Sequence, residues 1–172
     1  ARTRFVEALQ MSPRPDEARA VALSRLGVVE RWLGDHAAGG EHCAEAVRIA
    51  RGLGSPFRLA NALIWAYATT GGRLADEAAQ AGLEEALKLS RRLGDDWGVA
   101  HALNGLGDVY RELGRHGEAR PLYEEALAAF RRLDDRWMVA WSLEGLARVH
   151  LLVGNLDDAT ARLRESIETF PL

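Results

Sequence analysis

Glycines in the stretch LNGLGDVYRELG are the first candidates for chemistry, because glycine-rich turns can hold phosphate groups. Gly105 and Gly107 flank Leu106, and Gly114 follows. A dinucleotide-binding fingerprint needs Gly-x-Gly-x-x-Gly between a strand and a helix, but Tyr110 occupies the third glycine position here. A P-loop needs a Gly-Lys pair, and the chain has none. We therefore expect no nucleotide and no other cofactor at these glycines.

Histidines and cysteine are the next candidates, as metal ligands or nucleophiles. His36 and His42 are six residues apart, a spacing that does not suit one helical face, and no His-Glu-x-x-His or paired Cys/His spacing occurs. Cys43 is the only cysteine, so no intramolecular disulfide can form. We expect no metal site.

Paired carboxylates could act as general acids and bases. The pairs recur along the chain, which argues against one catalytic dyad and favours solvated surfaces. They are Glu84-Glu85, Asp95-Asp96, Glu124-Glu125, Asp134-Asp135 and Asp157-Asp158. With no nucleophile and base set either, we expect no catalytic residues and no enzyme activity.

Composition narrows the class of partner. The 172 residues carry a formal charge of -3, so no basic excess points to direct nucleic-acid binding. No apolar run is long enough for a membrane helix, and we expect a cytoplasmic protein. Lys88 is the only lysine among many arginines, as is typical of a GC-rich bacterial genome. The N-terminal stretch ARTRFVEALQ looks like the middle of a helix, so we expect a fragment of a longer chain.

An internal repeat must position all these residues. The sequence aligns with itself without gaps when it is shifted so that Ala20 falls on Ala60. The aligned sets include Phe57, Trp97 and Trp137; Ala20, Ala60, Ala100 and Ala140; and Leu23, Leu63, Leu103 and Leu143. We predict one array, 1–172, with a partial helix and loop in 1–16 and repeats at 17–56, 57–96, 97–136 and 137–172.

Each repeat divides into two amphipathic helices. In the third repeat, apolar residues recur at helical spacing on either side of a break at Gly114-Arg115-His116-Gly117. No segment alternates with period two, so we predict no strands. Cys43 aligns with Leu83, Tyr123 and Leu163, which predicts a buried position in the core.

The repeat resembles the tetratricopeptide repeats, whose pattern is Trp-x2-Leu-Gly-x2-Tyr followed by Ala-x3-Phe. The third repeat carries the matching residues Leu103, Leu106, Gly107, Tyr110, Ala119, Tyr123 and Ala126. The resemblance implies an all-α solenoid of antiparallel helix pairs in a right-handed superhelix. The units here have 40 residues, which is longer than the usual tetratricopeptide repeat. In this respect they are similar to the repeats of kinesin light chains and of bacterial SARP and LuxR-type regulators.

In this family, one face of each first helix lines a concave groove that receives peptides or partner proteins. The positions on that face are His101, Asn104, Asp108 and Arg111 in the third repeat, and Trp141, Glu144 and Arg148 in the fourth. The resemblance gives Asn104 the role of binding an extended peptide backbone. Towards the N-terminal half the same positions are more apolar, as at Val21 and Ile64.

We therefore expect a non-catalytic module that binds a protein or peptide in its groove, as the sensing or relay arm of a larger bacterial transcriptional regulator. The partner could be another domain of the same parent chain. The alternative is a structural spacer or oligomerisation segment with an idle groove. Because array ends expose apolar faces, we expect a monomer or a weak homodimer. The sequence does not identify the partner, the effector, the parent protein or the number of repeats in it.

Overall fold

The fold is all α-helical, as predicted. The computed structural model describes residues 2–11, 13–70 and 77–170. Within these ranges there is no strand, and the helices are α1 (Arg2–Met11), α2 (Glu17–Trp32), α3 (His36–Gly52), α4 (Pro56–Thr70), α5 (Glu77–Leu93), α6 (Asp96–Glu112), α7 (His116–Arg132), α8 (Arg136–Leu152) and α9 (Leu156–Thr169). The link between the two helices of the predicted second repeat lies outside the described residues.

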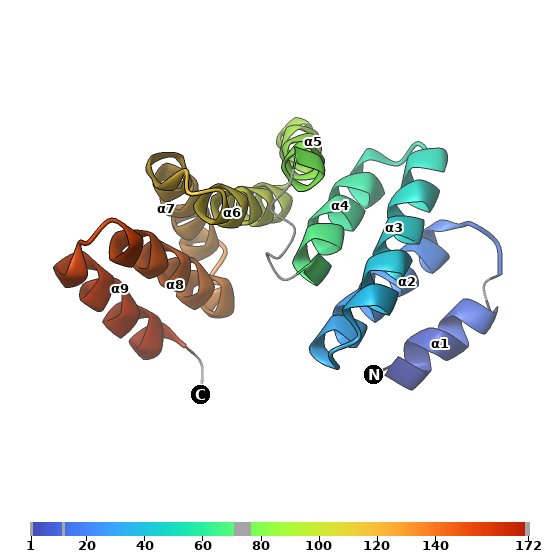
Figure 1. The fold of residues 1–172 in the computed structure, drawn as a ribbon. Coiled ribbons are helices and arrows are strands. Elements are labelled where there is room, and N and C mark those ends of the chain that lie inside the picture. Colours follow the sequence, from blue (N-terminus) through green and yellow to red (C-terminus); the bar gives the residue numbers. More distant parts are fainter. Residues whose placement is uncertain (1, 12, 71–76, 171–172) are drawn as a thin grey trace.

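The helices follow one another along an arc, with α1 at one end and α9 at the other (Figure 1). The even-numbered helices α2, α4, α6 and α8 contact one another in sequence. Among the described residues, the backbones of α3, α5, α7 and α9 do not approach each other in this way, and only long side chains reach from one to the next. Each of α3, α5 and α7 instead packs between two successive even-numbered helices. The even-numbered helices therefore form the inner, concave wall of the arc.

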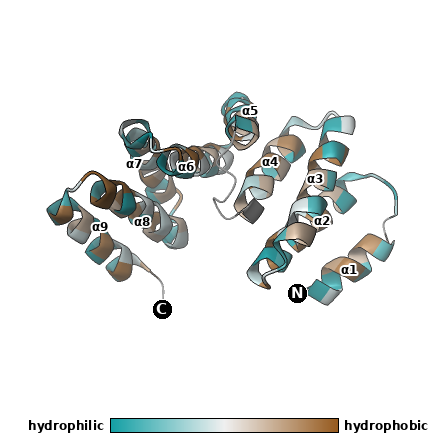
Figure 2. Cartoon of the chain, in the orientation of Figure 1, coloured by the Kyte–Doolittle hydropathy of each residue, from teal (hydrophilic) through white to brown (hydrophobic). Residues whose placement is uncertain are grey.

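Inner and outer helices differ in composition because they differ in burial. The inner helices α4, α6 and α8 are more hydrophobic than the outer helices α5 and α7 (Figure 2). An inner helix packs against neighbours on several sides, whereas an outer helix keeps one broad face in water. No helix in the described part of the chain is both long and apolar enough to cross a bilayer.

The turns recur at half the spacing of the repeat seen in the sequence, because the described turns after α2, α3, α5, α6, α7 and α8 are of the same kind. The helices α6, α7 and α8 have 17 residues each and are joined by links of equal length. Glycines with positive φ end most helices, at Gly34, Gly54, Gly94, Gly114 and Gly154. Asp134 takes the same place with φ 54°, in the left-handed region that favours glycine.

Aspartates at these turns cap the helices that follow. Asp95 accepts a 3.0 Å hydrogen bond from the Gly98 amide, and Asp135 accepts one of 3.0 Å from the Met138 amide. The sequence predicts a solvated surface for the Asp pairs, and the structure adds a capping role for these two half-buried residues. Residue spacing in the sequence does not distinguish an aspartate that caps a helix from one that is only a surface charge. The difference lies in the backbone geometry at the start of the helix.

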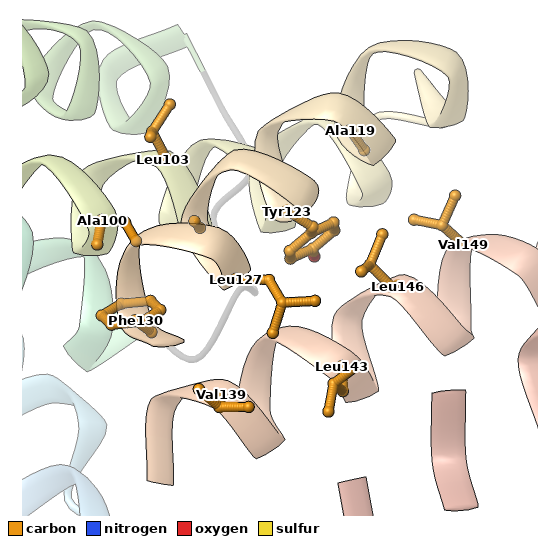
Figure 3. Packing of buried hydrophobic residues seen from close by; sticks show 12 residues of the cluster. Ala100, Leu103, Ala119, Tyr123, Leu127, Phe130, Val139, Leu143, Leu146 and Val149 are labelled. Atoms are coloured by element: carbon orange, nitrogen blue, oxygen red, sulfur yellow. The ribbon is translucent and has the colours of Figure 1, made fainter. Parts of the chain in front are cut away.

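The ring of Tyr123 organises the core of the C-terminal half. It projects from α7 and is fully buried, and Figure 3 shows it beside Leu146 of α8. A Cβ added to Gly107 on α6 would lie 3.0 Å from this ring, and one added to Gly145 on α8 would lie 2.7 Å from the ring's Cζ. Gly107 thus serves close packing, as predicted. Cys43 is also buried as predicted.

Three ion pairs tie successive outer helices together in the repeat register. They are Arg51–Glu85 at 2.6 Å, Arg91–Glu125 at 3.2 Å and Arg131–Glu165. Each pair lies one repeat further along the chain than the last, so one contact recurs at every repeat interface. All six side chains are at least a third exposed, and exposed pairs of this kind stabilise a fold by only about 0–1 kcal/mol each.

Candidate partner-binding groove

The seven residues predicted for the groove lie on two adjacent inner helices. His101, Asn104, Asp108 and Arg111 are on α6, and Trp141, Glu144 and Arg148 are on α8. The two helices contact each other, so the fold brings both sets to one region of the concave wall. Their side chains differ in what they can offer a partner.

Asn104 is buried between the two inner helices. Only 4% of it is exposed, and its Oδ1 accepts a 2.8 Å hydrogen bond from the hydroxyl of Ser142 on α8. This hydrogen bond joins the third repeat to the fourth. The side-chain carbonyl of Asn104 therefore serves the contact between the two inner helices.

Asp108 and Arg111 share a hydrogen-bond network with Tyr123. The Tyr123 hydroxyl donates to Asp108 Oδ1 at 2.7 Å, and Arg111 Nε donates to the same hydroxyl at 3.3 Å. Burial raises the pKa of the Asp108 carboxyl, and the hydrogen bonds from Tyr123 and Arg111 oppose that effect. Arg111 also contacts Glu112 at 2.8 Å. Internal partners thus occupy most of the polar groups of this pair.

The α8 residues are more accessible. Trp141 is 44% exposed, and Arg148 is exposed and pairs with Glu144 one turn earlier, with Nε 3.1 Å from Oε1. An exposed pair at i, i+4 is weak, so either partner can be recruited by a ligand at small cost.

His101 lies in a row of aromatic rings that crosses from α4 to α7. Its ring centroid is 3.9 Å from that of Trp97, 6.2 Å from that of Trp65 and 5.0 Å from that of Phe130. Burial and, to a smaller extent, the positive charge of Arg25 lower the pKa of His101 to about 4. His101 is thus a neutral packing residue near pH 7, and within the described residues its buried Nε2 has no hydrogen-bond partner.

A pocket lies next to this aromatic row, between α2 and α4. Its lining is Ala20, Val21, Ser24, Arg25, Arg58, Asn61, Ala62 and Trp65. No residue of the outer helix α3 contributes, so the pocket opens on the concave side. Two arginines and an asparagine gather here, which differs from the prediction that the N-terminal half of the groove is the more apolar.

Sequence reasoning missed Arg25 and Trp65 for an identifiable reason. They occupy one position in successive repeats, and the same position in the next two repeats holds Gly105 and Gly145. In the sequence, the groove positions are assigned from the third repeat, where the equivalent residue is glycine and has no side chain. A comparison of side-chain size at this position in the four repeats would have identified these two residues. The position holds an arginine, a tryptophan and then two glycines.

Metal chemistry finds no support in the described ranges. No group of three or more His, Cys, Asp or Glu side chains there is arranged to hold a metal ion. What the concave wall does offer is an exposed set of cationic, amide and aromatic groups, a combination suited to binding polypeptides.

Comparison with known proteins agrees with this geometry. The family model described as tetratricopeptide repeat matches residues 73–132 and 99–171, which together make up more than half of the chain. No match is found among curated protein sequences.

Solved structures show the same fold. BtubC (BKLC) from P. vanneervenii superposes with a TM-score of 0.76 at 22% identity, over 96% of this chain and 70% of its own. A Rap protein complexed with competence and sporulation factor gives 0.79 at 18% identity, over 89% of this chain and 43% of its own. A thermophilic tetratricopeptide repeat protein of Thermus thermophilus gives 0.68 at 26% identity, over 99% and 81%. The recurring helix pairs, the Leu-Gly packing positions and the family match lead to one conclusion: the chain belongs to the tetratricopeptide repeat family.

Proposed function

We propose that this array binds a polypeptide partner in its concave groove and has no catalytic role of its own. The observation that carries the proposal is the pocket between α2 and α4, where cationic, amide and aromatic side chains meet on the inner wall. Outer-helix side chains pair with each other along the repeats, whereas Arg25 in the pocket has no carboxylate partner among the described residues.

The size of the pocket favours a side chain over a small-molecule effector. Its volume is about 60 Å³, whereas sites for drug-sized ligands and cofactors enclose about 300–1,000 Å³. A chain laid along the groove could place one side chain in the pocket and others against Trp141 and the Glu144–Arg148 pair. Of the seven predicted residues, the three on α8 then form the C-terminal part of the same binding surface.

The test is selection from a library of synthetic dodecapeptides, followed by calorimetry on the recovered sequences. Val21→Arg introduces a long side chain at a pocket residue that is 39% exposed, so the variant can block the pocket without disturbing the core. We expect it to abolish binding of the selected peptides. Ala128→Arg, on an exposed position of the outer helix α7, is the matched control and retains binding.

Equal affinity of Val21→Arg and the unsubstituted chain for the selected peptides would move the site away from the pocket. Recovery of no peptide at all would favour the alternative role, a spacer or oligomerisation segment whose groove is idle. Equal melting temperatures of the two variants ensure that lost binding is not lost folding.

We further propose that the array is the sensing or relay arm of a larger cytoplasmic bacterial regulator. The proposal is supported by the extended repeat units and by the likeness in fold to a Rap protein that was crystallised with competence and sporulation factor. The coding sequence on either side of this chain tests the idea. A DNA-binding domain in the same polypeptide supports it, and a complete reading frame without one contradicts it.

A further inference from the structure

We infer that the pocket between α2 and α4 is a carboxylate-recognition subsite, in which Arg25 binds an acidic side chain or the C-terminal carboxylate of the partner polypeptide. This inference rests on the proposed groove function and names the chemistry of its ligand. The contact that determines specificity then lies between α2 and α4, and not at the α6 and α8 residues that the sequence predicts for the groove.

Arg25 is a cationic group of the pocket that has no acidic partner in the described part of the chain. It is exposed on α2. Two arginines on the same helices are paired instead, Arg19 with Glu45 at 3.0 Å and Arg58 with Glu17 at 3.1 Å. An arginine held in a pocket without a counter-charge can accept a carboxylate through two parallel hydrogen bonds.

Trp65 fixes the position of that guanidinium group. The Arg25 Cζ lies 4.6 Å from the centroid of the Trp65 ring. Stacking on an aromatic face leaves the in-plane N–H groups directed outward, which is the orientation that a carboxylate requires. Trp65 is held in turn by Trp97, whose ring centroid is 5.9 Å away. The cation is thus partly preorganised, which reduces the conformational entropy lost on binding.

The remaining lining residues suit an acidic side chain or chain end on a peptide. Arg58 adds a second positive charge, although Glu17 partly neutralises it at 3.1 Å. The Asn61 Nδ2 donates to the Phe57 carbonyl at 3.2 Å, and its carbonyl oxygen is an acceptor of the kind that a peptide N–H needs. Ala20 and Ala62 are almost fully buried and keep the base of the pocket apolar.

The experiment uses synthetic bead-bound hexapeptides with all residues allowed at each position, prepared with free and with amidated C-termini. The chain and its Arg25→Gln variant select from both pools. Arg92→Gln, the same change at an exposed arginine of the outer helix α5, is the matched control. We expect Asp and Glu to be enriched by the chain and by the control, and not by Arg25→Gln.

The two pools separate the two sources of carboxylate. Enrichment of Asp and Glu in the amidated pool assigns the subsite to side chains, and binding confined to the pool with free C-termini assigns it to chain ends. For the best acidic peptide, replacing its carboxylate by an amide should weaken binding to the chain about tenfold. The same replacement should change binding to Arg25→Gln by less than about twofold, because the interaction is already lost.

Charge reversal supplies an independent readout. Arg25→Glu should prefer Lys and Arg at the position where the chain prefers Asp and Glu, which a loss of packing alone does not produce. Peptides bound from both pools without a preference for Asp or Glu would overturn the subsite and leave the groove function standing. A carboxylate preference that Arg25→Gln retains would do the same. Selection of no peptide by any form would overturn the groove function itself.

Discussion

The hydroxyl of Ser142 donates a 2.8 Å hydrogen bond to the side-chain carbonyl of Asn104, and both residues are buried between α6 and α8. The two residues belong to successive repeats. Because apolar contacts between inner helices have no direction, one buried hydrogen bond gives this interface a defined register. Asn104 is therefore a residue of the repeat interface as much as of the groove.

Replacing Asn104 by Ala should lower the free energy of unfolding by about 1–3 kcal/mol, because the buried Ser142 hydroxyl loses its acceptor. Urea unfolding followed by circular dichroism measures this change. The double variant Asn104→Ala/Ser142→Ala should lose less than the sum of the single losses. If the single variants are as stable as the unsubstituted chain, the hydrogen bond does not stabilise the interface, and Asn104 is available to a ligand in the groove.

Tyr123 makes Gly145 a position where a single methyl group is harmful. Gly145→Ala places a Cβ 2.7 Å from the Tyr123 Cζ, and the fully buried ring has little room to move. We expect a loss of about 1–3 kcal/mol in the free energy of unfolding. Thermal melts or urea titrations of the variant provide the measurement.

Gly117→Ala is the matched control for Gly145→Ala. Gly117 also lies in a helix, but a Cβ added there meets no atom within 4 Å. Alanine is the better helix former, so this variant should be unchanged or more stable by about 0.5–1 kcal/mol. Similar losses at Gly117 and Gly145 would show that the packing around Tyr123 is not the cause.

Much of the fold could be read from the sequence, because it is encoded by repetition. The alignment of the sequence with itself predicted the helix pairs, and Leu-Gly at 33–34, 53–54, 93–94 and 113–114 already contained the shorter period of the turns.

The contacts of the groove residues were harder to predict from the sequence. Helical spacing predicted His101 and Arg111 on one face of the helix, but it could not show that Tyr123 on α7 binds Arg111. Such contacts depend on distances between helices, which periodicity does not contain.

Asp134 is the exception among the turns, and replacing it with glycine should stabilise the protein. The other positive-φ positions in the described chain hold glycine, whereas Asp134 has φ 54°. A non-glycine residue in the left-handed conformation costs about 1–2 kcal/mol of stability, and glycine avoids this cost. Glycine also loses more backbone entropy on folding, which partly offsets the gain. We expect a net gain of about 0.5–1 kcal/mol for Asp134→Gly. Gly114→Asp, the reverse change at φ 73°, should lower stability in the same unfolding assay.

His101 should make the protein less stable in mild acid. Its pKa is lowered to about 4 by burial and by the charge of Arg25, while an unfolded histidine titrates near 6.5. The unfolded state thus binds more protons between these values, so this stability is fully present above pH 6.5 and is lost as the pH falls towards 4. The loss from this residue amounts to about 3 kcal/mol at pH 4.

His101→Phe removes the titrating group and keeps an aromatic ring beside Trp97 and Phe130. We expect the variant to match or exceed the stability of the unsubstituted chain at pH 7, because it also removes a buried nitrogen without a partner in the described residues. The stability difference between pH 7 and pH 4, measured by urea unfolding, should shrink by about 3 kcal/mol. His36→Gln, at an exposed position of α3, should leave that difference unchanged. Parallel stability curves for His101→Phe and the unsubstituted chain across this range would show that His101 is solvated, and that the aromatic row does not exclude water from the groove.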